Sequence, residues 1–299
     1  MTARHPFRFG VVTALARSGE EWADRARRIE SLGFSTLVMP DRVQYTLSPL
    51  PALATAAAVT RTLRVGTYVA ANDFRNPVLL AKDAATLDLL SGGRFELGLG
   101  AGIPMPEDNQ MLGIPFDRGR VRVDRLAESL ALIKRLWAGE TVSAPGPHYA
   151  AAGASIMPRP VQEPRPPILI AGGGPRLLGL AAREADAIGL AIQPTDQLEA
   201  VEAKVAQLRS AAGDRFDDLE LNVNLMAVGD QVPSHVRMRM GLTASALAQM
   251  GAFPALLGTD DEMCDTLLRW RETVGISYVM VGDELMEALA PVVERLAGR

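Results

Sequence analysis

Short apolar runs alternate with helical segments along almost the whole chain, and this alternation limits the possible folds more than any other feature of the sequence. Each run has the length of a buried strand, and most segments between the runs carry apolar residues at helical spacing. We expect strands at residues 7–12, 36–39, 64–69, 94–97, 167–171, 187–190, 221–228 and 277–281. Eight strands with intervening helices describe a (β/α)8 TIM barrel of the α/β class.

Two segments are too long to be simple loops of such a barrel. One, rich in Pro and Gly, covers residues 141–157 ahead of the fifth strand, and the other covers residues 229–257 after the seventh. We therefore expect insertions after strands four and seven, the second of them as a lid or an inserted helix. A chain of 299 residues has a usual length for one barrel, so we expect a single domain, 1–299.

Composition excludes several kinds of partner. The net charge is −4, and no cluster of Lys and Arg stands clear of acidic neighbours, so we expect no nucleic-acid partner. No stretch approaches the roughly 20 apolar residues of a membrane span. Cys264 is the only cysteine, and His5, His148 and His235 lie far apart, so we expect neither an internal disulfide nor a metal site. These features are typical of a cytoplasmic enzyme with a small-molecule substrate.

A helix, a strand and a row of glycines follow one another in the middle of the first half of the chain. The helix begins after the cap residue Asn76 and ends at Gly92, and the strand at 94–97 runs into the row Gly98-Leu99-Gly100-Ala101-Gly102. Glycines at alternate positions let another molecule approach the backbone closely, and they equally permit a tight packing corner. The spacing leaves both interpretations open.

The loops that follow the strands carry the functional groups of such barrels. In this chain the candidates are Asp41 and Arg42 after the second strand, Val69 and Ala70 after the third, Gly100, Ala101, Gly102 and Glu107 after the fourth, and Gly172, Gly173, Gly174 and Arg176 after the fifth.

Three glycines stand directly before a helix at residues 172–174. They expose backbone N–H groups beside the positive end of the helix dipole, and this arrangement binds phosphate. Arg176 is placed to add a bidentate contact. A tight turn with a structural Pro175 explains the same residues, so both interpretations stay open.

Several motifs carry a family resemblance. Residues 76–102 resemble the LD-x-LS-x-GR-x-x-LG-x-G-x-G block of the bacterial-luciferase-like superfamily of flavin and deazaflavin oxidoreductases. The runs 38–42 and 166–186 and the late segments 258–262 and 275–278 are similar to further motifs of that superfamily. Together they cover nearly the whole chain, and among the subgroups it looks most like the coenzyme F420-dependent oxidoreductases.

The resemblance implies a tricyclic cofactor across the barrel mouth, with its phosphate at the loop of residues 172–174. It also implies a bulge after the third strand with a non-proline cis peptide between Tyr68 and Val69, which would back the central ring. The expected cofactor is coenzyme F420, with FMN as the alternative. The cofactor-binding residues that we expect are Asp41, Tyr68, Val69, Ala70, Gly100, Ala101, Gly102, Gly172, Gly173, Gly174 and Arg176.

The chain departs from the superfamily at one important place. Members that oxidise alcohols or sugars carry a histidine after the strand-two aspartate and a glutamate after the strand-four glycines, where this chain has Arg42 and Ile103. A neutral imidazole takes a hydroxyl proton near neutral pH, whereas an arginine stays protonated. We expect Arg42 either to neutralise an anionic substrate, reduced ring or enolate, or to form an ion pair with Asp41 or another loop acid. The catalytic candidates are Arg42, Asp41 and Glu107.

These observations predict an F420-dependent oxidoreductase that moves hydride between the deazaflavin and a small organic substrate. Reduction of an activated C=C or C=N bond is favoured over alcohol oxidation because of Arg42. The alternatives are an FMNH2-dependent monooxygenase of the same fold and a cofactor-free binding or regulatory barrel. The resemblance also leads us to expect a homodimer.

Overall fold

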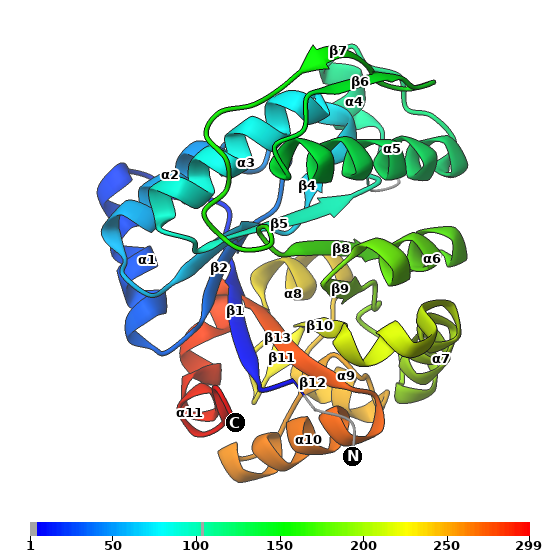
Figure 1. Ribbon diagram of the computed structural model, residues 1–299. Coiled ribbons are helices and arrows are strands. Elements are labelled where there is room, and N and C mark those ends of the chain that lie inside the picture. Colours follow the sequence, from blue (N-terminus) through cyan, green and yellow to red (C-terminus); the bar gives the residue numbers. More distant parts are fainter. Residues whose placement is uncertain (1–4, 103–104) are drawn as a thin grey trace.

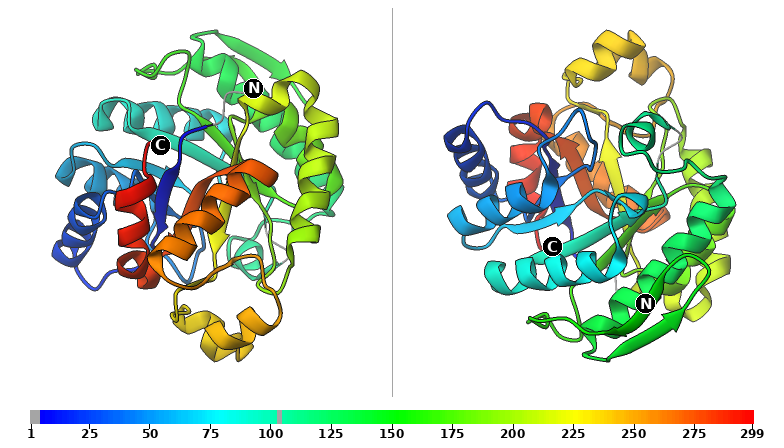
Figure 2. Two further views of the ribbon diagram at one scale, coloured as in Figure 1. Left: turned by 90° about the horizontal axis from the view of Figure 1, so that it is seen from below. Right: turned by 90° about the horizontal axis from the view of Figure 1, so that it is seen from above.

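A closed barrel of parallel strands forms the centre of the molecule (Figures 1 and 2), as a computed structural model that describes residues 5–102 and 105–299 shows. The strands are neighbours in the order β3-β2-β1-β13-β10-β9-β8-β5, and β3 also pairs with β5, which closes the ring. Their bounds are β1 (Arg8–Val12), β2 (Thr36–Met39), β3 (Arg64–Thr67), β5 (Phe95–Gly100), β8 (Ile168–Gly172), β9 (Ala187–Leu190), β10 (Glu220–Leu225) and β13 (Ile276–Gly282). The predicted (β/α)8 barrel is confirmed.

A long helix follows each barrel strand and covers the outside of the ring. The helices are α1 (Gly19–Ser31), α2 (Pro49–Val59), α3 (Pro77–Ser91), α5 (Gly119–Trp137), α6 (Pro175–Glu184), α7 (Leu198–Ala212), α10 (Asp260–Thr273) and α11 (Met286–Leu296), with short 3₁₀ turns η1 (Asn72–Phe74), η2 (Gly213–Asp218) and η3 (Asp283–Leu285). The predicted signals bound α3: the Asn76 side chain accepts from the Val78 N–H, and Gly92 adopts the left-handed conformation at the other end. In the part of the chain that the structure describes, no helix is both long and apolar enough to cross a membrane.

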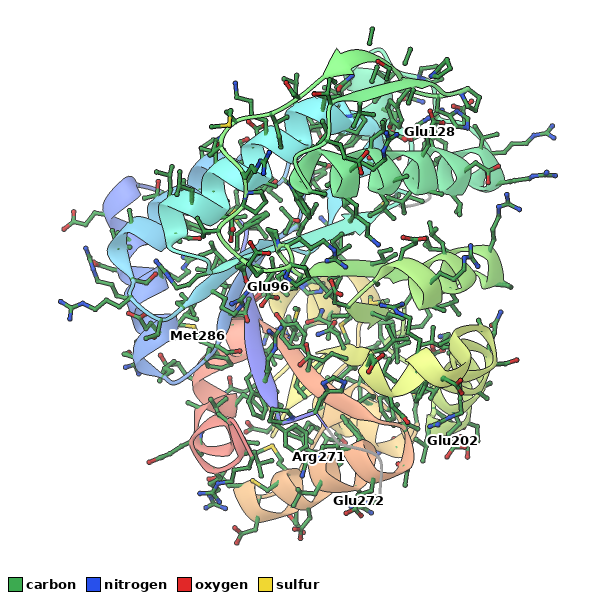
Figure 3. The ribbon with its side chains drawn as sticks, viewed as in Figure 1. Glu96, Glu128, Glu202, Arg271, Glu272 and Met286 are labelled. Carbon is green, nitrogen blue, oxygen red and sulfur yellow. The ribbon has the colours of Figure 1, made fainter. Side chains whose placement is uncertain are left out.

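Additional elements fill the two long segments that we expected to be insertions. The earlier one forms an antiparallel hairpin of β6 (Val142–Pro145) and β7 (Ala150–Ala154), and Glu128 of α5 (labelled in Figure 3) holds its turn by accepting from the backbone N–H groups of His148 and Tyr149. Between β5 and α5 lies the short α4 (Glu107–Met111). The later segment forms α8 (Ser234–Met240), α9 (Ala244–Gln249) and β12 (Ala255–Leu256), which pairs with β11 (Ala227–Val228) just before it. The two helices project from one side of the barrel (Figure 2).

Three strand predictions need correction. The strand expected at 94–97 continues through two of the glycines to the end of β5. This strand is buried along its whole length, and the neighbouring chain leaves room only for glycine at these two positions. The strand expected at 64–69 ends at Thr67, since the peptide bond between Tyr68 and Val69 is cis, as predicted, and β4 (Ala70–Ala71) resumes the pairing with β5. The strand expected at 221–228 is divided after Leu225, and its second part, β11, pairs with β12 instead of the barrel.

The two glycines of β5 lie against the chain between β3 and β4, at residues 67–69. A Cβ added at Gly98 would lie 1.9 Å from the Thr67 carbonyl oxygen, and one at Gly100 would lie 2.7 Å from Cγ2 of Val69. Neither position has room for a side chain, because the chain itself occupies the space. For these two glycines the structure therefore supports the packing corner, and the close approach is made by the neighbouring strand.

Charged side chains fill the opposite end of the barrel, where the strands begin. Arg8 Nη1 lies 2.8 Å from Glu96 Oε1 and Arg8 Nε lies 3.1 Å from Glu220 Oε1, while Arg64 forms a second ion pair with Glu96. Figure 3 labels Glu96 near the start of β5. Burial raises the pKa of Glu220 to about 7, against the attraction of Arg8 and with added repulsion from Glu96. Although burial opposes it, Arg8 and Arg64 hold the pKa of Glu96 below its usual value.

Candidate active site

A cavity of about 580 Å³ opens at the carboxyl ends of the barrel strands. This is the end at which (β/α)8 barrels place their functional groups. Its wall comes from the loops after β2, β3, β5, β8 and β9, with apolar side chains from Phe74, Met105, Phe116 and Leu177. The predicted residues that line it are Asp41, Arg42, Tyr68, Val69, Gly100, Ala101, Gly102, Gly172 and Gly173. Ala70 is buried behind this wall, and Glu107, Gly174 and Arg176 are not among the residues that line the cavity.

Asp41 and Arg42 each have a partner of opposite charge, and they are not paired with one another. Asp41 forms an ion pair with Arg75, whose Nη2 lies 3.2 Å from Oδ1, and it also accepts from the Ala71 N–H at 3.2 Å. Arg42 donates through Nε to Oδ2 of Asp108 in a short ion pair, and its guanidinium lies 5.5 Å from the Tyr45 ring. Of the two roles that we expected for Arg42, the pairing with a loop acid is present in the structure.

The two neighbouring acids of α4 have different surroundings. Glu107 is exposed at the start of the helix, outside the cavity. Asp108 is 2% exposed and lines the cavity. Adjacent helical residues point about 100° apart, and in α4 Asp108 and Asn109 face the barrel while Glu107 faces solvent. The loop acid that pairs with Arg42 is therefore Asp108, the neighbour of the catalytic candidate Glu107. Ile103 lies outside the described residues.

The floor of the cavity is made by Tyr68 and Val69. The Tyr68 hydroxyl donates to Oδ1 of Asn222 at 2.7 Å, and the Asn222 amide donates in turn to the Tyr278 carbonyl oxygen at 3.0 Å. Burial raises the pKa of Tyr68, so the ring remains a neutral hydrogen-bond donor. This chain of hydrogen bonds through the barrel interior holds the Tyr68 ring in place beneath the cavity.

The loop of residues 172–174 connects β8 to α6 at one side of the cavity. A Cβ at Gly172 would lie 2.1 Å from Cδ2 of Leu177, and one at Gly173 would lie 3.1 Å from the Ala191 Cβ. Gly174 is the N-cap of α6 and supplies no side-chain hydrogen bond. The N–H groups in the first turn of a helix have no partner within that helix. Bare backbone and unpaired first-turn amides fit an anionic group, as the phosphate interpretation requires.

Arg176 is held away from this loop. It forms a short ion pair with Asp124, which connects α6 to α5, and Figure 1 shows these two helices side by side. Both side chains are exposed, and the Arg176 guanidinium lowers the pKa of Asp124. Its contacts in the structure belong to the surface between the two helices.

Arg122 of α5 is a cavity residue that the sequence did not single out. Its Nη1 donates to the carbonyl oxygens of Ala101 at 2.8 Å and Gly102 at 2.9 Å, and its guanidinium lies 4.4 Å from the Phe116 ring. A run of arginines at 118, 120, 122 and 125 was visible, but the spacing alone does not say which of them turns toward the barrel.

The charges along the cavity wall give Arg122 a distinct position. The carboxylates of the wall each lie against an arginine: Asp41 against Arg75, Asp73 against Arg125 at 2.8 Å, and Asp108 against Arg42. In the described part of the chain, the bonds of Arg122 go to neutral carbonyl groups. The wall therefore carries a cation that no wall carboxylate neutralises, which favours an anionic ligand.

The three histidines lie elsewhere. His5 borders a small cavity at the opposite end of the barrel, His148 lies in the turn of the β6–β7 hairpin, and His235 belongs to α8. The lining of the main cavity, within residues 5–102 and 105–299, contains no imidazole. Over the same residues, no three side chains of His, Cys, Asp or Glu are grouped so that they could hold a metal ion.

The barrel, its cis bulge and its cavity at the carboxyl ends of the strands agree with the match of a family model. The model for luciferase-like monooxygenases matches residues 5–250, so the chain belongs to that family. Among named relatives, the F420-dependent glucose-6-phosphate dehydrogenase of Beutenbergia cavernae is 37% identical over 165 residues, which are 52% of this chain and 48% of the relative. The protein of the same name from Microbacterium testaceum is 33% identical over 190 residues, covering 60% of this chain and 55% of the relative. The chain thus spans about half the length of the curated relatives that it matches.

Solved structures extend the likeness over almost the whole chain. The coenzyme F420-dependent tetrahydromethanopterin reductase of Methanopyrus kandleri superposes with a TM-score of 0.79 at 18% identity, covering 98% of this chain and 100% of that one, which establishes the shared fold. The monooxygenase RslO1 of Streptomyces bottropensis superposes with a TM-score of 0.72 at 25% identity, covering 97% of both chains.

Proposed function

We propose that the protein is an F420-dependent oxidoreductase that moves hydride between the deazaflavin and a small organic substrate, in the direction that reduces an activated C=C or C=N bond. Family membership and the relatives named for F420 support the cofactor. The bound deazaflavin would supply a carbon centre that gives or accepts hydride. The residues of this chain that would hold it are the glycines at 172–174 at its phosphate, with Tyr68 and Val69 behind its ring.

The ion pairs of Asp41 with Arg75 and of Arg42 with Asp108 carry the proposed direction of the reaction. Oxidation of an alcohol requires a base that takes the hydroxyl proton. In the cavity wall, Asp41 is bound to Arg75, Asp108 is bound to Arg42, and no imidazole is present among the described residues. Reduction of a double bond requires instead that negative charge on the substrate be stabilised after hydride arrives, and the guanidinium of Arg42 suits that task.

The balance of the proposed reaction is simple. One carbon of the double bond gains a hydride, the other atom gains a proton, and the two electrons leave the reduced cofactor. We assign the electrostatic role to Arg42 and the support of the loop to Asp41. Glu107 remains the proposed route for a proton from solvent, because it is exposed on α4, whose next residue, Asp108, lines the cavity.

An isotope experiment tests the cofactor and the direction together. Reduced F420 labelled with deuterium at C5 is incubated with the protein and a set of activated alkenes and imines under anaerobic conditions. Deuterium in the reduced product is the expected result. Turnover that strictly requires O₂, with one oxygen atom of labelled gas in the product, would favour the second candidate, an FMNH2-dependent monooxygenase. The match to the luciferase-like monooxygenase model and the likeness to RslO1 favour that candidate.

A further inference from the structure

The ion pair between Arg42 and Asp108 leaves binding groups of both partners unused. The pair is formed by Nε of Arg42 and Oδ2 of Asp108. Across the described residues, Oδ1 of Asp108 has no hydrogen-bond partner, although the side chain is only 3% exposed. A buried carboxylate oxygen without a donor is costly, and such atoms in native proteins are normally satisfied by a ligand, an ion or water.

The place of this pair within the cavity points to a ligand. Both residues line the cavity, and the apolar side chains of Met105 and Phe116 line it too. The guanidinium of Arg42 offers N–H donors beyond Nε, since Arg carries five in a fixed fork. An acceptor without a donor and several donors therefore belong to neighbouring residues of a largely apolar wall. Oδ1 itself is covered in the structure, so a ligand reaches it only when the Asp108 carboxylate turns toward the cavity.

We propose that Arg42 and Asp108 together select the substrate, and that the substrate is a neutral unsaturated carbonyl compound with an N–H directly beside its carbonyl, such as an unsaturated lactam. The carbonyl oxygen accepts from Arg42, and the neighbouring N–H donates to Oδ1 of Asp108. This inference rests on the proposed function, because the same carbonyl group is the one that activates the C=C bond toward hydride. The apolar side chains contact the rest of the molecule.

The pair also explains why a neutral substrate is favoured at this point of the wall. Asp108 already balances the charge of Arg42, so a carboxylate substrate would lie beside a buried acid. A molecule that presents both a donor and an acceptor satisfies both residues and leaves no buried charge without a partner.

Three probes of nearly the same shape test this selection: the six-membered α,β-unsaturated lactam, its N-methyl derivative, and the corresponding unsaturated lactone. Their dissociation constants are measured by saturation-transfer NMR with the protein loaded with oxidised F420, so that no turnover is needed. The lactam is expected to bind roughly tenfold more tightly than the other two, as for a hydrogen bond to a charged group. Equal affinity for the three probes in the wild-type protein would overturn the proposal without any variant.

The variant Asp108→Asn sharpens the test. Arg42 Nε requires an acceptor, so the amide oxygen of the new side chain should take the place of Oδ2 and its NH₂ group the place of Oδ1. The lactam N–H then meets a donor, and we expect its roughly tenfold advantage to fall to threefold or less. Gln110→Ala, on the exposed side of the same helix, is the matched control and should keep the advantage.

Two outcomes separate this inference from the proposed function. If the lactam preference is present and lost in Asp108→Asn, but no probe is reduced by F420, the selection stands and the proposed reaction is wrong. If the variant keeps the lactam preference and instead loses affinity for F420 itself, the pair binds the cofactor and the inference is wrong.

Discussion

Replacing Glu220 by Gln should stabilise the protein in mildly alkaline solution and leave its stability unchanged in acid. The Glu220 side chain is only 14% exposed at the start of β10, where it shares the guanidinium of Arg8 with Glu96. Arg64 also pairs with Glu96, so the positive charges of both arginines lie against Glu96, whereas Glu220 has only a share of Arg8. Burial therefore raises the pKa of Glu220 from 4.5 to about 7, since the attraction of Arg8 does not offset it and Glu96 adds repulsion.

The sign of the effect follows from proton binding in the two states. Below about pH 4.5 the carboxyl of Glu220 is protonated in both the folded and the unfolded chain, and above about pH 7 it is ionised in both. Between these values the folded state holds a proton that the unfolded state has released, so the free energy of unfolding falls as the pH rises. The difference between the pKa of Glu220 in the unfolded chain, 4.5, and in the folded protein, about 7, corresponds to about 1.4 kcal/mol for each unit. Above pH 7, ionised Glu220 therefore lowers the free energy of unfolding by about 3 kcal/mol.

Glu220→Gln removes this cost, because the neutral amide needs no compensating charge and still offers an oxygen to Arg8. At pH 8 the variant should unfold about 5 °C above the wild-type protein, and at pH 4.5 the two should unfold together. Calorimetry at both pH values measures the difference. Glu96→Gln, which leaves Arg64 without its acid and Arg8 with Glu220 alone, should be less stable than wild type at both. A difference between Glu220→Gln and wild type that is the same at both pH values would refute the reasoning.

Three further substitutions test the cavity and its walls. Gly173→Val should weaken F420 binding by roughly tenfold or more without unfolding the barrel, because a side chain would stand between the loop and the cofactor phosphate; unchanged affinity in a folded variant would remove this loop from the site. Arg42→Ala should lower kcat/KM by about 10²-fold and, because it leaves Asp108 buried without a partner, should lower the free energy of unfolding by about 3 kcal/mol. Adding Asp108→Leu to this variant should restore the stability and not the activity. Full activity in Arg42→Ala would show that the ion pair is purely structural. Gly98→Ala should cost about 3 kcal/mol in urea unfolding, since its Cβ would lie 1.9 Å from the Thr67 carbonyl oxygen; wild-type stability would show that β5 can move aside.

Much of the barrel could be predicted because buried parallel strands and helix ends leave local signals. The strands at 36–39 and 187–190 were predicted with the bounds that the structure has, since each is a short apolar run between a glycine or acidic segment and a loop. The glycine row was harder to interpret. Whether Gly98 makes room for a ligand or for the chain depends on Thr67, which lies far away in sequence and meets β5 only through the pairing of β3 and β4 with that strand.

The candidate site was predicted less completely, because its ion pairs join different loops. The rule that functional groups follow the strands selected Asp41 and Arg42, and both residues line the cavity. It could not identify Arg75 or Asp108 as their partners, since the partners depend on how η1 and α4 pack against the barrel. For the same reason the sequence drew attention to Glu107, where the facing acid is its neighbour.

A signal that the sequence did contain lies at the other end of the barrel. Arg8, Arg64 and Glu220 each stand first in a strand whose remaining residues are almost all buried, and Glu96 stands second in β5. A charge in such a strand is tolerated only if an opposite charge meets it, and the first residues of parallel strands lie at one end of a barrel. Charges at the strand starts of a predicted (β/α)8 chain therefore indicate one mutual cluster and a role in stability. Charges just after the strand ends, such as Arg42, belong to loops whose partners only the fold reveals, and those are the ones to test for function.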